Sequence, residues 1–510
     1  MSDKIIKGRF VGNISANLAS FAFNLAVSFW FTPYIVRHLG VEAYGYVPLV
    51  LNIVNYGSIL TAAFNSMVAR FIVVELKKGN PSTASAYFNT SFFVSSAFAL
   101  LCVPVIIIGT LDIQHLINIP VSLVPGVRAL FALAGANFLL STIMTPFSTA
   151  MFYANRFDIT NGISVLALFT RIAFMVFMFD WCSPSIVYVG ASFTLAAAVS
   201  AVAVVIASRR LMPEVAINVR QFNGNAFHEF TSSGIWNSLN QLGTMLLLQI
   251  ELLMSNVLLG PLCAGQYAAT LTFPNLMRGL NTQIVSVFGP TMTFLFARND
   301  IKGLVAYTNQ ASRIIGMLMG LPLGILLGYG DKIMGLWLGP QFSSQYLLLV
   351  ILTVQLVIGL PTTPLYTLFV VVNHVRVPGI VTVVSGVCNL VLAYSLGRTS
   401  LGAYGIAIAG GASLLLKNLF FTPIYGAALL NQKWWVFFKP IKESLVVTLM
   451  TWSLCYVLKY IFLIKSWYEL SACIGVTCIV ISGLLYSVII QPDERNQIKG
   501  LANKVFRLAT

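Results

Sequence analysis

Four charged side chains lie inside long apolar stretches of this chain. Arg171, Arg278 and Lys417 are cations and Glu251 is an acid. A charge at mid-bilayer costs at least ~2.5–3.5 kcal/mol and usually faces a cavity or a partner. Three cations against one acid make a positive interior that attracts anions, and Arg holds phosphate through paired donors. The pattern predicts a site for a phosphate group or an acidic sugar.

Polar residues accompany these charges at helical spacing. They form three sets, one each in the first, seventh and eighth apolar runs: Asn13, Asn17, Ser20, Asn24 and Ser28; Asn237, Gln241, Thr244, Glu251 and Ser255; and Asn275, Arg278, Thr282 and Ser286. Spacings of three and four residues place each set on one side of a helix. The sets predict the wetted wall of a cavity. The alternative is that they hold neighbouring helices together.

The candidate substrate-binding residues come from these sets and from the intramembrane cations. They are Arg278, Lys417, Arg171, Asn24, Asn237, Asn240, Thr244 and Asn275. Glu251 is the candidate for coupling to H⁺ or Na⁺, with a structural ion pair as the alternative. Lys417 lies near the end of its helix, so extension of its ammonium group to the membrane surface is the alternative for this residue.

The composition is that of an integral membrane protein. Of 510 residues, 58% are hydrophobic and only 9% are charged, and the mean hydropathy is +0.85. Soluble domains are about 25% charged, so a soluble enzyme and a disordered chain are both excluded. The fold class is all-α, because lipid leaves no partners for unpaired backbone groups and the alternation of membrane barrels is absent.

We predict about fourteen transmembrane helices. They span residues 11–36, 43–69, 87–110, 126–152, 161–180, 186–208, 233–257, 263–289, 308–330, 346–372, 379–397, 404–425, 443–464 and 468–490. An even number places both termini on one side, and most Lys and Arg lie in loops on that side. The opposite loops hold only Arg37, Arg128, Lys332, Arg398, Lys459 and Lys465. Both termini are therefore expected in the cytoplasm.

An internal repeat relates the two halves of the chain. Leu39-Gly40-x4-Gly45 recurs as Leu259-Gly260-x4-Gly265, an offset of 220 residues, and the same offset maps Ser20 onto Asn240 and Asn55 onto Asn275. Halves separated by six helices share one orientation, and such halves enclose a substrate site between them. The expected divisions are a six-helix bundle over 1–220, a second over 221–428, and two additional helices with a cytoplasmic tail over 429–510.

Common nucleotide-binding and hydrolase motifs are missing from the sequence. It has no GxxxxGK[ST], HExxH or GxSxG, so ATP-driven transport and hydrolase activity are not expected. The cysteines lack metal or redox spacing. We expect no enzyme activity, no metal, no cofactor and no nucleic-acid partner.

The stretch from Thr32 to Gly45, TPYIVRHLGVEAYG, resembles the same region of bacterial polysaccharide transporters, which include the O-antigen (Wzx-type) flippases of the multidrug/oligosaccharidyl-lipid/polysaccharide exporter superfamily. Arg70, Glu75 and Gly79-Asn80 resemble that family's first cytoplasmic loop, and Asn155-Arg156-Phe157-Asp158 its second. The likeness covers roughly residues 8–425. The chain differs from the related lipid II flippase, which has several arginines on its first two helices.

This resemblance implies a multi-pass flippase of the bacterial cytoplasmic (inner) membrane. It would carry undecaprenyl-diphosphate-linked oligosaccharide, such as an O-antigen unit of lipopolysaccharide biosynthesis, between leaflets by alternating access. Arg278, Lys417 and Arg171 would hold the headgroup, and membrane lipids, a polysaccharide polymerase and chain-length machinery are the implied partners.

Two alternatives remain open from the sequence. A cation-coupled multidrug exporter of the same superfamily would need acids in the first six spans, and the sequence has none there except at the ends. An integral polysaccharide polymerase would need a sizeable outer loop, and none is expected.

Overall fold

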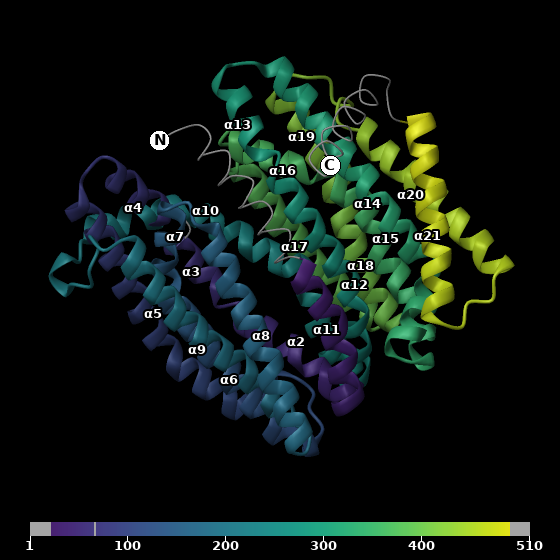
Figure 1. Ribbon diagram of the computed structural model, residues 1–510, viewed down its shortest axis with the longest axis horizontal. Helices are drawn as coiled ribbons and strands as arrows, with labels where there is room; N and C mark the ends of the chain where they lie inside the picture. Colours follow the sequence, from purple (N-terminus) through teal and green to yellow (C-terminus); the bar gives the residue numbers. More distant parts are fainter. Residues whose placement is uncertain (1–21, 66–67, 490–510) are drawn as a thin grey trace, which may run out of the picture. The chain divides into compact units, whose positions relative to one another are not determined.

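The computed structural model describes residues 22–65 and 68–489, and the regular structure of these residues is entirely helical (Figure 1). They fall into two compact units. The first unit comprises the described residues of Met1–Thr272 and His374–Lys417, and the second those of Phe273–Asn373 and Asn418–Thr510. The bundle boundaries expected from the repeat stay a prediction.

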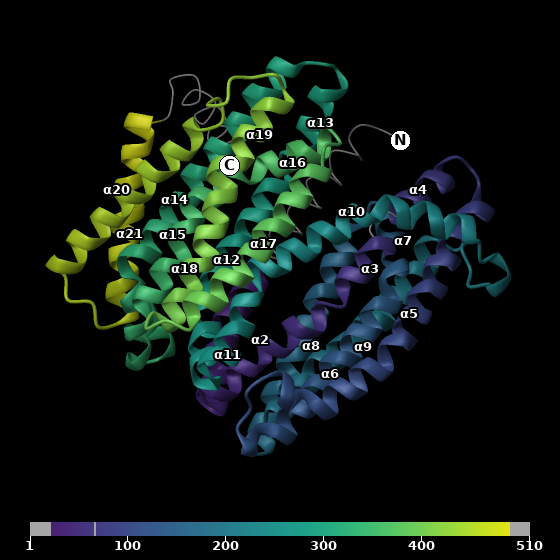
Figure 2. The same ribbon diagram turned by 180° about the vertical axis from the view of Figure 1, so that it is seen from behind.

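The first unit begins with a helix over 22–39. Its further helices are α2 (Val41–Asn55), α3 (Ser58–Asn65), α4 (Val68–Lys77), α5 (Pro81–Leu116), α6 (Val124–Met144), α7 (Thr149–Tyr153), α8 (Phe157–Trp181), α9 (Ile186–Leu211), α10 (Gly224–Leu248), α11 (Ile250–Leu259), the start of α12 (Pro261–Ser286), α17 (Arg376–Gly397) and α18 (Gly402–Leu416). Helices α5, α6, α8 and α9 lie side by side in both views (Figures 1 and 2).

Among the described residues, the second unit contains the rest of α12, seven further α-helices or short 3₁₀ segments, and then α20 and α21. They are α13 (Gly289–Ala297), α14 (Ile301–Leu338), η4 (Pro340–Gln345), α15 (Tyr346–Gly359), η5 (Leu360–Thr362), α16 (Thr363–Val371), α19 (Thr422–Leu429), α20 (Lys439–Ile461) and α21 (Trp467–Leu484). A π-helical turn, η6 (Lys417–Phe421), joins α18 to α19. Figure 2 shows α14, α15, α20 and α21 together.

The protein is a multi-pass membrane protein. Ten described helices are long and apolar enough to cross a membrane. The helices Gly234–Leu248 and Ile250–Leu259, which meet at a bend of 42°, give an eleventh candidate if they are counted together as one span. These coincide with eleven of the fourteen expected spans. The first expected span begins outside the described residues, the second is interrupted between α2 and α3, and the eighth, α12, carries polar residues that lower its hydropathy. The count of fourteen and the cytoplasmic termini therefore stay predictions.

Turns at equivalent places in the repeat have the same backbone conformation. Gly40 and Gly260 have φ of 84° and 89°, and each lies between the end of one helix and the start of the next. Gly79 and Asn299, also 220 residues apart, have φ of 82° and 55°. This left-handed region suits Gly and, less well, Asn. The shared conformations support the internal repeat.

The second glycine of each repeat motif lies at a close helix crossing inside the first unit. A Cβ on Gly45 of α2 would lie 2.7 Å from the Cα of Gly265 of α12. In the other direction, a Cβ on Gly265 would lie 2.8 Å from the carbonyl carbon of Val41. Small residues allow such backbone approach between membrane helices. The repeat motif is thus also a packing motif.

The segment that joins the two repeats is fixed to α5. Asn89 is fully buried, and its amide group donates to the carbonyls of Ser85 and Ala216 and to the Gln221 side chain, each at 2.9 Å. Its oxygen accepts from the Asn218 amide at 2.7 Å. One side chain thereby holds the connection between α9 and α10 in place.

In the second unit, α20 packs along a row of glycines on α14. Gly316, Gly320, Gly324 and Gly328 recur every four residues and face Ser444, Val447, Thr451 and Cys455. A Cβ on Gly324 would lie 2.8 Å from Cγ2 of Thr451. Helix α20 is therefore an integral part of this unit.

Candidate functional site

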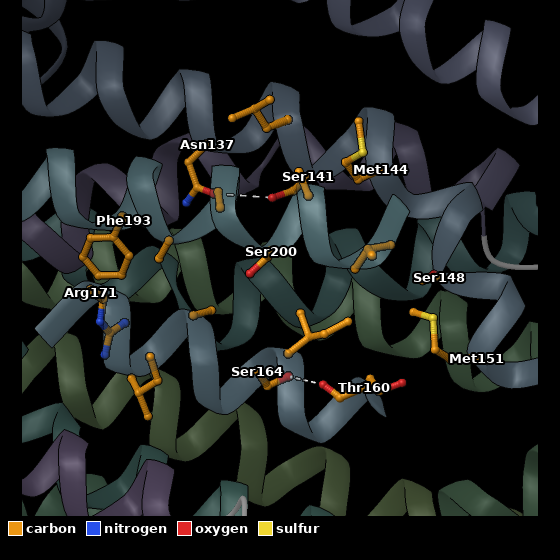
Figure 3. A pocket seen from close by; sticks show the side chains of 18 of the residues that line it. Asn137, Ser141, Met144, Ser148, Met151, Thr160, Ser164, Arg171, Phe193 and Ser200 are labelled. Carbon is orange, nitrogen blue, oxygen red and sulfur yellow. Dashed lines mark hydrogen bonds between the residues drawn. The ribbon is translucent and has the colours of Figure 1, made fainter. Parts of the chain in front are cut away.

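The first unit contains a pocket of about 460 Å³ between α6, α7, α8 and α9. Its polar lining comprises Asn24, Asn137, Ser141, Ser148, Thr160, Ser164, Arg171 and Ser200. Figure 3 labels all of these residues except Asn24. Apolar side chains such as Met144, Met151 and Phe193 complete the wall. No acid is among the described residues that line it. The pocket combines hydroxyl and amide groups with a single cation.

Arg171 lies at one end of this pocket, on α8. Its guanidinium carbon is 4.6 Å from the centre of the Phe31 ring and 4.7 Å from that of Phe193. Its Nε atom is buried and has no hydrogen-bond partner among the described residues. Aromatic faces attract a cation and restrict its orientation, but they satisfy none of its N–H donors. The arrangement leaves a fixed, planar donor group for an anionic ligand.

Three serine hydroxyls of the pocket already donate their protons within the protein. Ser164 donates to the carbonyl of Thr160 at 3.0 Å, one turn earlier in α8, and Ser148 donates to that of Thr145 at 2.6 Å. Ser141 donates to the Asn137 side chain at 3.4 Å (Figure 3). A hydroxyl oxygen retains acceptor capacity after it donates. The wall therefore offers acceptors to a ligand rich in hydroxyl donors, such as a sugar.

Two of the predicted site residues share this pocket. Asn24, on the helix over 22–39, and Arg171, on α8, both line it although 147 positions separate them in the sequence. The stripe that predicted Asn24 also includes Asn13, Asn17 and Ser20, which lie outside the described residues. Sequence reasoning missed Phe31 and Phe193 because aromatic residues are common in membrane helices and carry no distinct signal.

Asn237, Asn240 and Thr244 lie on α10 and are not among the residues that line this pocket. Asn237 and Thr244 are half-buried and Asn240 is exposed. Thr244 donates to the Asn240 carbonyl at 2.8 Å. Beside them, Gly243 packs against the backbone of Thr382 on α17. Their role in substrate binding stays a prediction.

Glu251 occupies a buried position just after the bend between α10 and α11. Its side chain is 5% exposed and accepts a hydrogen bond from the hydroxyl of Tyr267 at 2.5 Å. Gly410 of α18 contacts the carboxylate so closely that a Cβ there would overlap it. Asn389 of α17 donates to the carbonyls of Leu246 and Leu247 before the bend, at 3.1 and 3.3 Å. The acid is thus enclosed by α12, α17 and α18.

Lys417 and Arg278 lie at irregular or polar stretches of their helices. Lys417 is buried, with 8% exposure, and begins the π-helical turn η6; such turns are frequent at functional sites. Arg278 donates to the Asn275 side chain at 3.0 Å, which joins two predicted site residues on α12. That Arg171, Arg278 and Lys417 serve one ligand stays a prediction.

The second unit has a buried polar cluster that sequence reasoning missed. Tyr366 of α16 donates to the Asn418 side chain at 2.8 Å and lies 3.1 Å from the Thr422 hydroxyl. Asn281 of α12 donates to Thr363 at 3.0 Å. Tyr366 therefore ties α16 to Asn418 within η6 and to Thr422 directly after it.

Comparisons with known proteins show a related membrane protein and solved structures of similar fold. The chain is 35% identical over 491 residues to the uncharacterized membrane protein EpsK of Bacillus subtilis, covering 96% of this chain and 97% of that protein. It resembles the inward-facing structure of a MATE-family multidrug transporter of the MOP superfamily, with a TM-score of 0.66 and 15% identity over 81% of this chain and 94% of that one. It also resembles the lipid II flippase MurJ in its inward closed conformation, with a TM-score of 0.60 and 12% identity over 92% and 99%. No family model matches.

Proposed function

This chain belongs to the family of the EpsK membrane protein of Bacillus subtilis, and from that premise we propose that it is a flippase for lipid-linked oligosaccharides. Because EpsK is itself an uncharacterized membrane protein, the proposed substrate is argued from the residues of this chain. The fold that the chain shares with MATE transporters and MurJ supports alternating access, and the chemistry of the pocket supports the substrate class.

The observation that carries the proposal is the position of Arg171. A guanidinium between two aromatic rings, in a pocket whose described lining has no acid, suits an anionic group. The acceptor-rich wall beside it suits sugar hydroxyls. A sugar attached to a diphosphate combines both features. The proposed substrate is therefore undecaprenyl-diphosphate-linked oligosaccharide, with Arg278 and Lys417 as further contacts to its headgroup.

The finer features of the proposal follow from this substrate. The protein lies in the bacterial cytoplasmic (inner) membrane with about fourteen spans and both termini in the cytoplasm. It moves a Wzx-type substrate, such as an O-antigen unit, from the inner to the outer leaflet and hands it to a polysaccharide polymerase. Glu251, buried and hydrogen-bonded to Tyr267, is the proposed coupling site for H⁺ or Na⁺.

The test is complementation of a deletion strain. Arg171→Ala removes a charged hydrogen-bond donor worth about 1.5–3 kcal/mol, so we expect flipping to fall by about 10- to 150-fold. Arg209→Ala is the matched control, because Arg209 is an exposed cation at the end of α9. Surface polysaccharide is measured by immunoblot, lipid-linked sugars by mass spectrometry and protein level in the same cells. Wild-type polysaccharide in Arg171→Ala cells with equal protein would refute the proposed site.

A cation-coupled multidrug exporter is the second candidate function. The observation in its favour is Glu251, a buried acid of the kind that binds a cationic drug or a coupling ion. Deletion would then lower resistance to cationic dyes and leave surface glycans intact. The flippase proposal expects the reverse result.

A further inference from the structure

A second polar pocket lies in the second unit, where α14 and α20 begin. It has a volume of about 410 Å³ and is lined mainly by Asn309, Gln310 and Arg313 of α14 and by Lys439, Pro440 and Glu443 of α20. Both helices run in the same direction from this pocket, since Gly316 packs on Ser444 and Gly328 on Cys455. The pocket therefore lies at one end of a parallel helix pair.

The charged groups of this pocket are ordered and net positive. Arg313 donates from Nε to Glu443 at 2.7 Å, with the two side chains 12% and 18% exposed. Lys439 is exposed at the first position of α20. Two cations against one acid favour an anion. The ion pair fixes the guanidinium plane in which Arg binds phosphate.

One polar atom of the pocket lacks a partner. The side-chain oxygen of Asn309 is buried without a hydrogen-bond partner among the described residues. A buried polar atom left in this way costs about 1–3 kcal/mol. A ligand that carries a hydroxyl donor next to its anionic group would satisfy it.

The surroundings of the pocket are typical of a membrane surface. Trp434 and Trp435 precede α20 and are 58% and 52% exposed, and the ammonium group of Lys433 lies 5.3 Å from the centre of the Trp435 ring. Trp is enriched at the level of lipid headgroups. One turn beyond Glu443 on the same side of α20, Val446 is 40% exposed, which offers apolar surface to an acyl chain.

We propose that this pocket binds the headgroup of an anionic phospholipid with a hydroxyl-bearing headgroup, of the phosphatidylglycerol type. The phosphodiester lies against Arg313 and Lys439, and a headgroup hydroxyl donates to Asn309. Basic pockets between helices on the cytoplasmic side recognise such lipids. The inference rests on the membrane orientation proposed above, but not on the proposed substrate.

The experiment is native mass spectrometry of the full-length protein purified in a neutral detergent, with dioleoyl phosphatidylglycerol as the probe. Lys439→Gln removes one cation, and we expect binding about fivefold weaker, the equivalent of about 1 kcal/mol. Lys442→Gln is the matched control, because Lys442 is an exposed cation on the same helix that does not line the pocket. We expect it to bind lipid as the wild type does.

Further binding measurements distinguish a lipid phosphate from free inorganic phosphate. Dioleoyl phosphatidylcholine has a headgroup with neither a net charge nor a hydroxyl. The wild type and Lys439→Gln should therefore bind this lipid equally well. Inorganic phosphate at millimolar concentration should not displace phosphatidylglycerol. Equal effects of the two lysine variants, or displacement by inorganic phosphate, would overturn the lipid site. Arg171→Ala should retain the lipid, so failure of the flippase proposal is distinguishable from failure of this one.

Discussion

The crossing of α2 and α12 gives a sharp prediction, because it joins the glycines of the two repeat motifs. In Gly265→Ala the new Cβ would lie 2.8 Å from the carbonyl carbon of Val41. The usual separation of non-bonded carbon atoms is about 3.5–4.0 Å, so the overlap is about 1 Å. The neighbouring atom belongs to the backbone. A change of rotamer cannot relieve the overlap, and the helices must separate.

The size of the effect follows from this overlap. Forcing additional atoms into a packed contact typically costs about 1–3 kcal/mol, and here the close approach of the two backbones is lost as well. We expect a melting temperature several degrees below that of the wild type. Gly45→Ala should have a similar effect, because its Cβ would lie 2.7 Å from the Cα of Gly265.

The assay is thermal unfolding of the purified protein in detergent. Gly162→Ala is the matched control, since Gly162 lies in the interior of α8 and a Cβ there would meet nothing within 4 Å. Its change should be neutral or slightly stabilising, because Ala has the higher helix propensity. If Gly265→Ala and Gly162→Ala melted at the same temperature, the account of this crossing would be wrong.

Three further predictions concern other parts of the fold. Gly324→Val should lower the melting temperature, because its Cβ meets Thr451 of α20, whereas Gly475→Val, whose Cβ meets nothing within 4 Å, should not. Asn89→Ala removes the hydrogen bonds that hold the Ala216 carbonyl and the Asn218 amide against α5, so limited proteolysis should cut the segment over 212–223 faster than in the wild type. The pKa of Glu75 is lowered by lysine and asparagine side chains that donate to it. Its support of the turn after α4 is therefore present above the ordinary carboxyl pKa and is lost as the pH falls through the lowered value. The hydrogen-exchange protection of residues 75–80, measured relative to the intrinsic exchange rate at each pH, should fall at low pH in the wild type and stay constant over that range in Glu75→Gln.

Much of the fold could be predicted from the sequence because lipid imposes simple rules. An apolar run of spanning length has to be helical, and eleven expected spans are found as candidate membrane helices. The glycine turns could be anticipated at Gly40 and Gly260, where the same residue recurs. The equivalence of Gly79 and Asn299 could not, because two different residue types adopt the same left-handed conformation.

The candidate site could be predicted only in part. Charge in an apolar run marks Arg171 as unusual, helical spacing marks Asn24, and both residues line the same pocket. The serines of α6 and α9 that complete the pocket are isolated in the sequence and form no stripe. The partners of Glu251 also escaped prediction, since Tyr267 and Gly410 acquire their roles only when three helices pack together. Such contacts depend on tertiary packing, which periodicity does not encode.

The two repeats share left-handed turns at equivalent positions but differ in charge, and this difference bears on mechanism. The offset of the glycine turns maps Phe31 onto Glu251. In the first repeat, Phe31 packs against the cation Arg171; in the second, the equivalent position is itself an acid that is held by Tyr267 and contacts Gly410. Equivalent places in the two halves thus favour ligands of opposite charge. A transporter that binds an anionic headgroup in one half and a coupling cation in the other needs this asymmetry, which supports separate roles for Arg171 and Glu251.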